Sequence, residues 1–173
     1  MKNFLSRLRY RYEDVYFSVK RKWQRSIRGY ADSDLWNLDG YLAEHLYKMM
    51  DRFIRSKRTS YYPVNFTSPE DREKMTDEES EKEKQDWEDI LIKIREGFKA
   101  AQDICTDEGP KDYPYPYEPE GLDYLMNPEL EPEEHKEKVV IWLKKHNEWY
   151  DERKKVFEEG MDLLKKYFFA LWD

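Results

Sequence analysis

The last forty residues carry the pattern that most restricts the fold, because apolar residues recur there every seven positions. One row holds Trp142, Trp149, Val156 and Leu163, and the row beside it holds Leu143, Tyr150, Phe157, Leu164 and Leu171. Such a repeat predicts left-handed, nearly parallel packing against other helices. We therefore predict a helix over residues 133–172, about 60 Å long at about 1.5 Å per residue. For so long a helix we expect either a bend at Gly160 or contact of its first half with a second copy.

Two further helices are predicted near the N-terminus. Apolar spacings of three and four predict a helix over residues 4–28, ended by Gly29, with the stripe Leu5, Leu8, Tyr12, Val15, Val19, Trp23 and Ile27. A second helix over about 34–56, capped by Asp32 or Ser33, is expected to bury Leu35, Leu38, Leu42, Leu46, Met49 and Phe53.

A fourth helix is predicted in the middle of the chain, after a loop at about 57–69. Ser68 and Pro69 resemble a helix start, and Thr76 with Glu79 has the spacing of a capping box. The polar segment that follows is expected to be solvated. The buried stripe is then Trp87, Ile90, Leu91, Ile94, Phe98 and Ala101.

Residues 106–132 contain six of the eight prolines, so no long helix can form there. We expect a Pro/Tyr-rich loop that lies as an aromatic strap over the helices, or else serves as a ligand lid or partner-binding loop. The fold predicted from the whole sequence is all-α: one domain over residues 1–173, a bundle of about four helices.

Charge is distributed unevenly along the chain. Residues 1–30 hold nine Lys/Arg against two acidic residues, a net charge of +7, so the remainder carries −14 within the total of −7. Either the basic helix packs on the acidic body, or it meets an anionic partner: nucleic acid, nucleotide or membrane surface. The single cysteine excludes an intramolecular disulfide and favours a reducing cytoplasm. The chain shows neither a signal peptide nor an apolar run of 18 residues, and we expect no membrane partner.

Asp39 is the most prominent polar candidate, because a 3.6-residue period puts it at the edge of the predicted stripe of residues 34–56. A carboxylate in a core needs a partner. We predict a structural lock to Arg25, Arg28 or Tyr30, or alternatively a polar group in a pocket beside Trp36 and Tyr41.

No catalytic motif is recognisable in the sequence, and His45, His135 and His146 lack metal-ligand spacing. We therefore expect a non-enzymatic protein with no metal and no cofactor. His146 is expected to be a hydrogen-bonded core histidine, and Cys105 to be unreactive.

Three segments in fixed order, RGYADSDLWNLDGYLA, WEDILIKIREGF and EEGMDLLKKYFFALWD, cover about a quarter of the chain. Together they resemble a family of uncharacterised small phage and prophage proteins, with an Arg-Gly-Tyr turn, a Trp-x-Leu-Asp-x-Tyr-Leu-Ala helix and a closing Lys-Tyr-Phe-x-x-Leu-Trp-Asp. The resemblance implies a phage origin and an all-α fold, and carries no established activity. It also groups polar residues that are expected to meet at one end of a bundle: Arg28, Tyr30, Asp32, Trp36, Asp39, Lys166, Tyr167 and Trp172. The candidate binding residues are Arg25, Arg28, Tyr30, Trp36, Asp39, Lys166 and Tyr167.

From these observations we predict a phage accessory protein of the host cytoplasm that counteracts host defence by sequestering an anionic small ligand, such as a nucleotide. Aromatic side chains can stack on bases, and Arg and Lys can hold phosphates. One alternative is an acidic protein that inhibits a host enzyme by binding to it. Another is a nucleic-acid-binding accessory that uses the basic N-terminal helix. A homo-oligomer is expected in each case.

Overall fold

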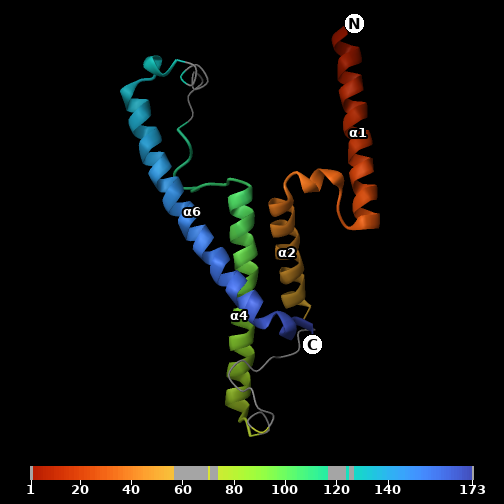
Figure 1. Ribbon diagram of the computed structural model, residues 1–173, viewed down its shortest axis with the longest axis vertical. Helices are drawn as coiled ribbons and strands as arrows, with labels where there is room; N and C mark the ends of the chain where they lie inside the picture. The colour runs from red at the N-terminus through yellow and green to blue at the C-terminus, as the bar shows by residue number, and fades with distance from the viewer. Residues whose placement is uncertain (1, 57–69, 71–73, 117–123, 125–126, 173) are drawn as a thin grey trace. The chain divides into compact units, whose positions relative to one another are not determined.

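The computed structural model describes residues 2–56, 70, 74–116, 124 and 127–172; of residues 2–13, 128 and 172 it describes the backbone alone. Contacts within the chain group its residues into two compact units, Met1–Leu42 and Ala43–Asp173, and each is described by itself. Most of the described residues are helical and none lies in a strand, as the sequence predicted (Figure 1). The predicted start at Ser68 and Pro69 lies outside the described residues.

The first unit consists of helix α1, a turn and the start of helix α2. Helix α1 spans Lys2–Arg28 and ends at Gly29, whose φ of +81° is the left-handed conformation expected of a glycine at a helix C-terminus. A 3₁₀ helix, η1, follows at Asp32–Leu35, and α2 spans Leu38–Arg55. The single helix predicted over 34–56 is therefore wrong at its start, because the chain turns between η1 and α2.

The second unit is built on two long helices, α4 at Asp77–Cys105 and α6 at Glu133–Tyr167. Figure 1 shows α6 crossing α4 obliquely. At the crossing Gly97 faces Gly160, and a Cβ added to Gly160 would lie 2.9 Å from the Gly97 Cα atom. Gly160 thus has a role that the sequence did not predict, since its missing side chain lets two backbones touch. The bend predicted at this residue stays a prediction.

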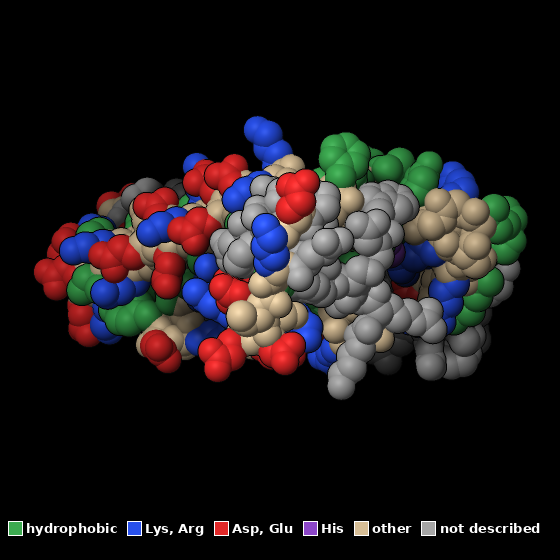
Figure 2. Space-filling view, turned by 90° about the horizontal axis from the view of Figure 1, so that it is seen from below, with side chains coloured by type: hydrophobic (Ala, Val, Ile, Leu, Met, Phe, Trp, Pro, Cys, Tyr) green, Lys and Arg blue, Asp and Glu red, His purple; other side chains and the backbone are tan. Residues whose placement is uncertain are grey.

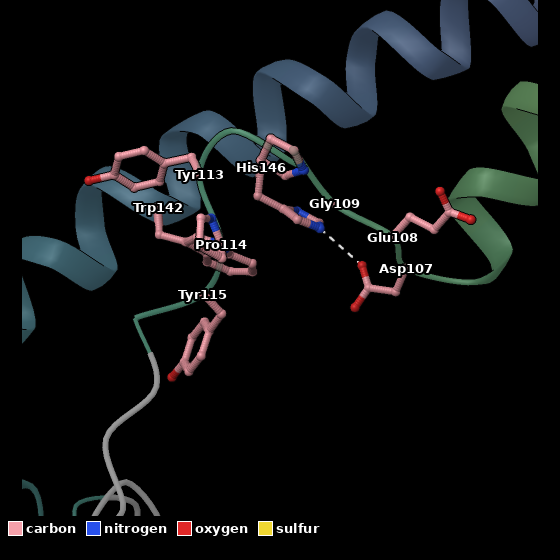
Figure 3. A pocket seen from close by; sticks show the side chains of 9 residues that line it. Asp107, Glu108, Gly109, Tyr113, Pro114, Tyr115, Trp142 and His146 are labelled. Atoms are coloured by element: carbon pink, nitrogen blue, oxygen red, sulfur yellow. Dashed lines mark hydrogen bonds and ion pairs between the residues drawn. The ribbon is translucent and has the colours of Figure 1, made fainter.

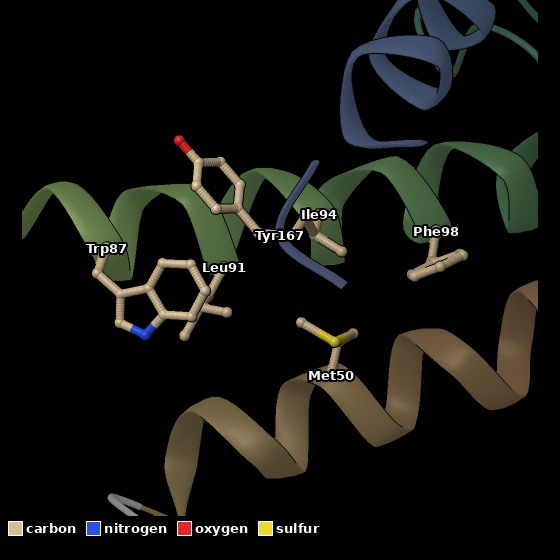
Figure 4. Packing of buried hydrophobic residues seen from close by; sticks show 6 residues of the cluster. All are labelled: Met50, Trp87, Leu91, Ile94, Phe98 and Tyr167. Carbon is tan, nitrogen blue, oxygen red and sulfur yellow. The ribbon is translucent and has the colours of Figure 1, made fainter. Parts of the chain in front are cut away.

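The core of the second unit lies along α4. Trp87, Leu91, Ile94 and Phe98 of α4 are buried, which confirms most of the predicted stripe, and Tyr167 at the end of α6 packs edge-on against Trp87 (Figure 4). Helix α2 adds Met50 to this cluster. Beyond α6 the chain continues as a 3₁₀ helix, η3, at Phe168–Trp172, so the predicted long helix ends about five residues early.

The face that α2 buries differs from the prediction. Ala43 and Met50 are buried, whereas Leu35, Leu38, Leu42 and Met49 are 44–56% exposed, so the prediction that these four lie in the core is wrong. Leu46 and Phe53 lie at the margin of the core, together with Tyr47 and Ile54. At 100° per residue the buried face is rotated by about a quarter turn from the predicted one.

The start of α4 confirms the predicted capping box. Thr76 Oγ1 accepts a hydrogen bond from the Glu79 backbone N–H, and the Glu79 carboxylate accepts one from the Thr76 N–H at 2.8 Å. The polar segment that follows, residues 77–86, is helical, and most of its side chains are solvated, as expected. Its one buried side chain is that of Glu83. Among the described residues, no helix combines the length and apolar character needed to cross a bilayer.

Candidate functional site

The predicted lock on the first unit exists, but its acid is Asp34 and not Asp39. Arg25 donates two hydrogen bonds to the Asp34 carboxylate, from Nε at 2.9 Å and from an Nη at 2.6 Å. The Ala31 N–H donates a third at 2.8 Å. Asp34 is buried, and these bonds, led by those of Arg25, lower its pKa to about 2. The pair therefore fixes η1 against the last turns of α1.

A second set of bonds holds the same turn through Asp32. The Gln24 amide donates to one carboxylate oxygen of Asp32 at 2.6 Å and accepts from the Asp32 N–H at 3.1 Å. Arg28 donates to the other oxygen at 2.7 Å, and its guanidinium lies 5.2 Å from the centre of the Tyr30 ring. Arg28 and Tyr30, two of the predicted binding residues, thus have partners within the turn.

Asp39 itself is exposed in the first turn of α2, and within the described part of the chain it makes no hydrogen bond or ion pair. The predicted Asp39 lock is wrong because the break between η1 and α2 removes Asp39 from the face next to Arg25. Trp36, at 94% exposure, lies beside that break. Tyr41 donates from its hydroxyl to the Gly29 carbonyl oxygen at 2.5 Å.

The remaining two predicted site residues belong to the second unit. Tyr167 is a core residue, and the Lys166 Nζ atom lies 4.8 Å from the centre of its ring. The meeting of these residues with those of the first unit stays a prediction. The sequence analysis did not identify Asp34 and Gln24 as partners. The signal that could have identified Asp34 is its position, six residues after the basic helix end at Arg28 and shortly after the capping Gly29.

Helix α1 presents an exposed surface with two chemical sides. Lys20, Arg21 and Lys22 are exposed and make no hydrogen bond or ion pair with any described residue, unlike Arg25 and Arg28. The other side is an apolar stripe, whose members with described side chains are 62–63% exposed: Val15, Val19, Trp23 and Ile27. We call these residues the α1 stripe.

A separate hollow of about 270 Å³ lies in the second unit between α6 and residues 107–115 (Figure 3). Tyr115 packs edge-on against Trp142 at 5.0 Å, and Trp142 lies 4.7 Å from the His146 ring. His146 Nε2 is 3.0 Å from Asp107 Oδ1. The described part of the Pro/Tyr-rich loop is therefore an aromatic strap on α6. His146 is hydrogen-bonded, as predicted, but it lines this hollow and is not the core residue that was expected.

The chemistry of this hollow disfavours a phosphate-bearing ligand. Two carboxylates, Asp107 and Glu108, line it, and it offers no Lys or Arg. A phosphate there would meet like charge. Farther along, the buried His135 ties the strap to α6, with Nε2 3.1 Å from the Pro116 carbonyl oxygen and Nδ1 2.5 Å from Glu131 Oε1. The hollow thus resembles a packed loop more than a nucleotide site.

In the described ranges, no group of three or more His, Cys, Asp or Glu side chains is arranged to hold a metal ion. Acidic and basic side chains are intermixed over the left half of the face shown in Figure 2.

No family model, no curated protein and no solved structure matches this chain.

Proposed function

We propose that this protein is a non-enzymatic binding protein that attaches to an anionic partner through the basic residues of α1. The observation that carries the proposal is that the basic residues of α1 differ in their partners. Arg25 and Arg28 are engaged by Asp34 and Asp32, whereas Lys20, Arg21 and Lys22 are exposed without a hydrogen bond or ion pair among the described residues.

The proposal keeps the charge sign of the partner predicted from the sequence and changes the place where it binds. The described hollow beneath the strap offers carboxylates to a ligand, while the exposed side of α1 offers ammonium and guanidinium groups. A long helix with three exposed cations spread around it suits an extended anionic surface better than one small molecule. Sequestration of a nucleotide stays a prediction, as does inhibition of a host enzyme.

From the resemblance to phage proteins alone, we propose that this attachment serves a phage accessory protein that counteracts host defence. Neither the host target nor an oligomeric state is needed for the binding step itself. The binding step can therefore be tested first, with a simple polyanion.

The test is the salt concentration at which the full-length protein elutes from immobilised heparin. Changing Lys20, Arg21 and Lys22 together to Glu should lower the elution salt markedly, because fewer counterions are released on binding. The matched control changes Lys144, Lys155 and Lys165 to Glu; these residues are exposed on α6, and the change in net charge is the same. An equal loss in both variants would refute α1 as the attachment site.

A further inference from the structure

The α1 stripe and the exposed cations Lys20, Arg21 and Lys22 are arranged in a definite order around the helix. With 100° per residue, Val15, Val19, Trp23 and Ile27 centre on one direction, and Lys20 and Lys22 lie about 80° to either side of it. Arg21 lies about 180° from it. The exposed lysines therefore border the apolar stripe, and Arg21 occupies the opposite side.

We infer that the anionic partner of α1 is the surface of a lipid bilayer rich in anionic headgroups, an inference that rests on the proposed function. A helix lying in a bilayer interface buries an apolar stripe among the acyl chains and directs Lys and Arg to the headgroups. Lysines at the border of the stripe can extend their ammonium groups to the phosphates while their methylene chains stay with the stripe.

The composition of the α1 stripe favours this occupant over nucleic acid. Val15, Val19 and Ile27 are branched aliphatic side chains, more than 60% exposed, and such side chains cannot stack on bases. Trp23, with an apolar ring and one N–H donor, suits the boundary between headgroups and acyl chains. A nucleic-acid contact would use the cations and Trp23 and would leave the three aliphatic side chains in water.

The distribution of charge along the chain also favours α1 as the segment that meets an anionic bilayer. Residues 1–30 carry +7 and the rest of the chain carries −14, so an anionic surface attracts the first segment and repels the rest. The inference departs from the sequence-based expectation of no membrane partner. That expectation rested on the lack of segments that cross a bilayer, whereas α1 would lie along the surface, which the sequence analysis had named among the anionic partners of the basic segment.

The test is sedimentation of the full-length protein with large vesicles of phosphatidylcholine, with and without 30% phosphatidylglycerol. The wild-type protein should sediment with the anionic vesicles and much less with the neutral ones. Three variants, Val19→Asp, Lys22→Gln and Arg21→Gln, change the net charge by the same −1 at three places around α1. Circular dichroism checks that each remains helical.

The loss of vesicle binding in the three variants should be larger the closer the substituted position lies to the bilayer. Val19→Asp should weaken partitioning at least tenfold, because it adds a carboxylate to the stripe. Lys22→Gln should weaken it about fivefold, the value of one Lys near an anionic surface. Arg21→Gln should change it twofold or less, because it lies about one helix diameter farther away, close to a Debye length.

Two outcomes would overturn the inference and would do so separately from the proposed function. If the wild-type protein binds heparin but no anionic vesicles, α1 has an anionic partner that is not a bilayer. If Arg21→Gln weakens vesicle binding as much as Lys22→Gln while Val19→Asp matches both, attraction of charge alone is responsible and the α1 stripe is not inserted. A wild-type protein that binds neither heparin nor anionic vesicles would refute the proposed function itself.

Discussion

The crossing of α4 and α6 allows a prediction in which two known effects oppose each other. Replacing a helical glycine by alanine ordinarily stabilises a helix, by about 1 kcal/mol. At Gly160 the new Cβ atom would lie 2.9 Å from the Gly97 Cα atom and 3.1 Å from the Lys93 carbonyl oxygen. Both are backbone atoms that cannot rotate away, so the two helices must move apart.

Overpacking of this kind costs about 1–3 kcal/mol, and a gap of even about 0.5–1 Å forfeits part of every contact along the crossing. We therefore expect Gly160→Ala to lower the free energy of unfolding by about 1–2 kcal/mol despite the gain in helix propensity. For a chain of this size the melting temperature should fall by about 3–6 °C.

The measurement is thermal and urea unfolding followed by circular dichroism, with two controls. Comparing Glu159→Ala with Glu159→Gly at an exposed position of α6 measures the propensity term alone. The double variant with Gly97→Ala should lose less than the sum of the two single variants, because the helices are already separated. A Gly160→Ala protein that is more stable than the wild type by the Glu159 increment would refute close backbone contact.

Three further predictions concern the first unit and the start of α4. The pKa of Asp34 is lowered to about 2, so its pair with Arg25 should be intact above pH 4 and lost as the pH falls toward 2. The loss should lower the free energy of unfolding by about 1–2 kcal/mol, after allowance for the half-exposed Arg25. An NMR titration of the Asp34 carboxyl group checks this, and Arg25→Gln should return the pKa toward 3.8. Thr76→Ala should cost about 1 kcal/mol in urea unfolding by removing the acceptor of the Glu79 N–H, whereas Thr76→Ser should not. Asp39→Asn should change stability by about 0.5 kcal/mol or less, and a loss of several kcal/mol would show that Asp39 has a partner in the folded protein.

Local chemistry was readable from the sequence wherever a few neighbouring residues decide the outcome. Gly29 ends α1 because a left-handed residue is needed there, and Thr76 with Glu79 starts α4 because the two satisfy each other's backbone N–H groups. The stripe of α4 could be predicted because Trp87, Leu91, Ile94 and Phe98 form one apolar face on a helix that begins with ten polar residues.

The candidate site was only partly readable. Arg25 and Arg28 were identified as partners of a carboxylate, but the carboxylate was misassigned. The start of α2 depends on where the chain turns after Gly29. That turn is held by bonds to Asp32 and Asp34, among them those from Gln24 and Arg25, which lie eight and nine positions away. A one-dimensional pattern that assumes a continuous helix cannot include them.

By itself, the sequence determined that the chain is mainly helical, that α1 ends at Gly29 and that α4 starts after Thr76. It also determined that α1 has an apolar stripe and several basic residues. Only the tertiary structure decided which of two overlapping apolar faces of α2 is buried, because Leu38, Leu42 and Met49 have the same helical spacing as Ala43, Met50 and Ile54. It also decided the role of Gly160, since a glycine in a helix becomes a contact only when a second glycine, Gly97, lies opposite it. Periodicity records which side chains share a face, but the choice of the packed face depends on the shape of the neighbour.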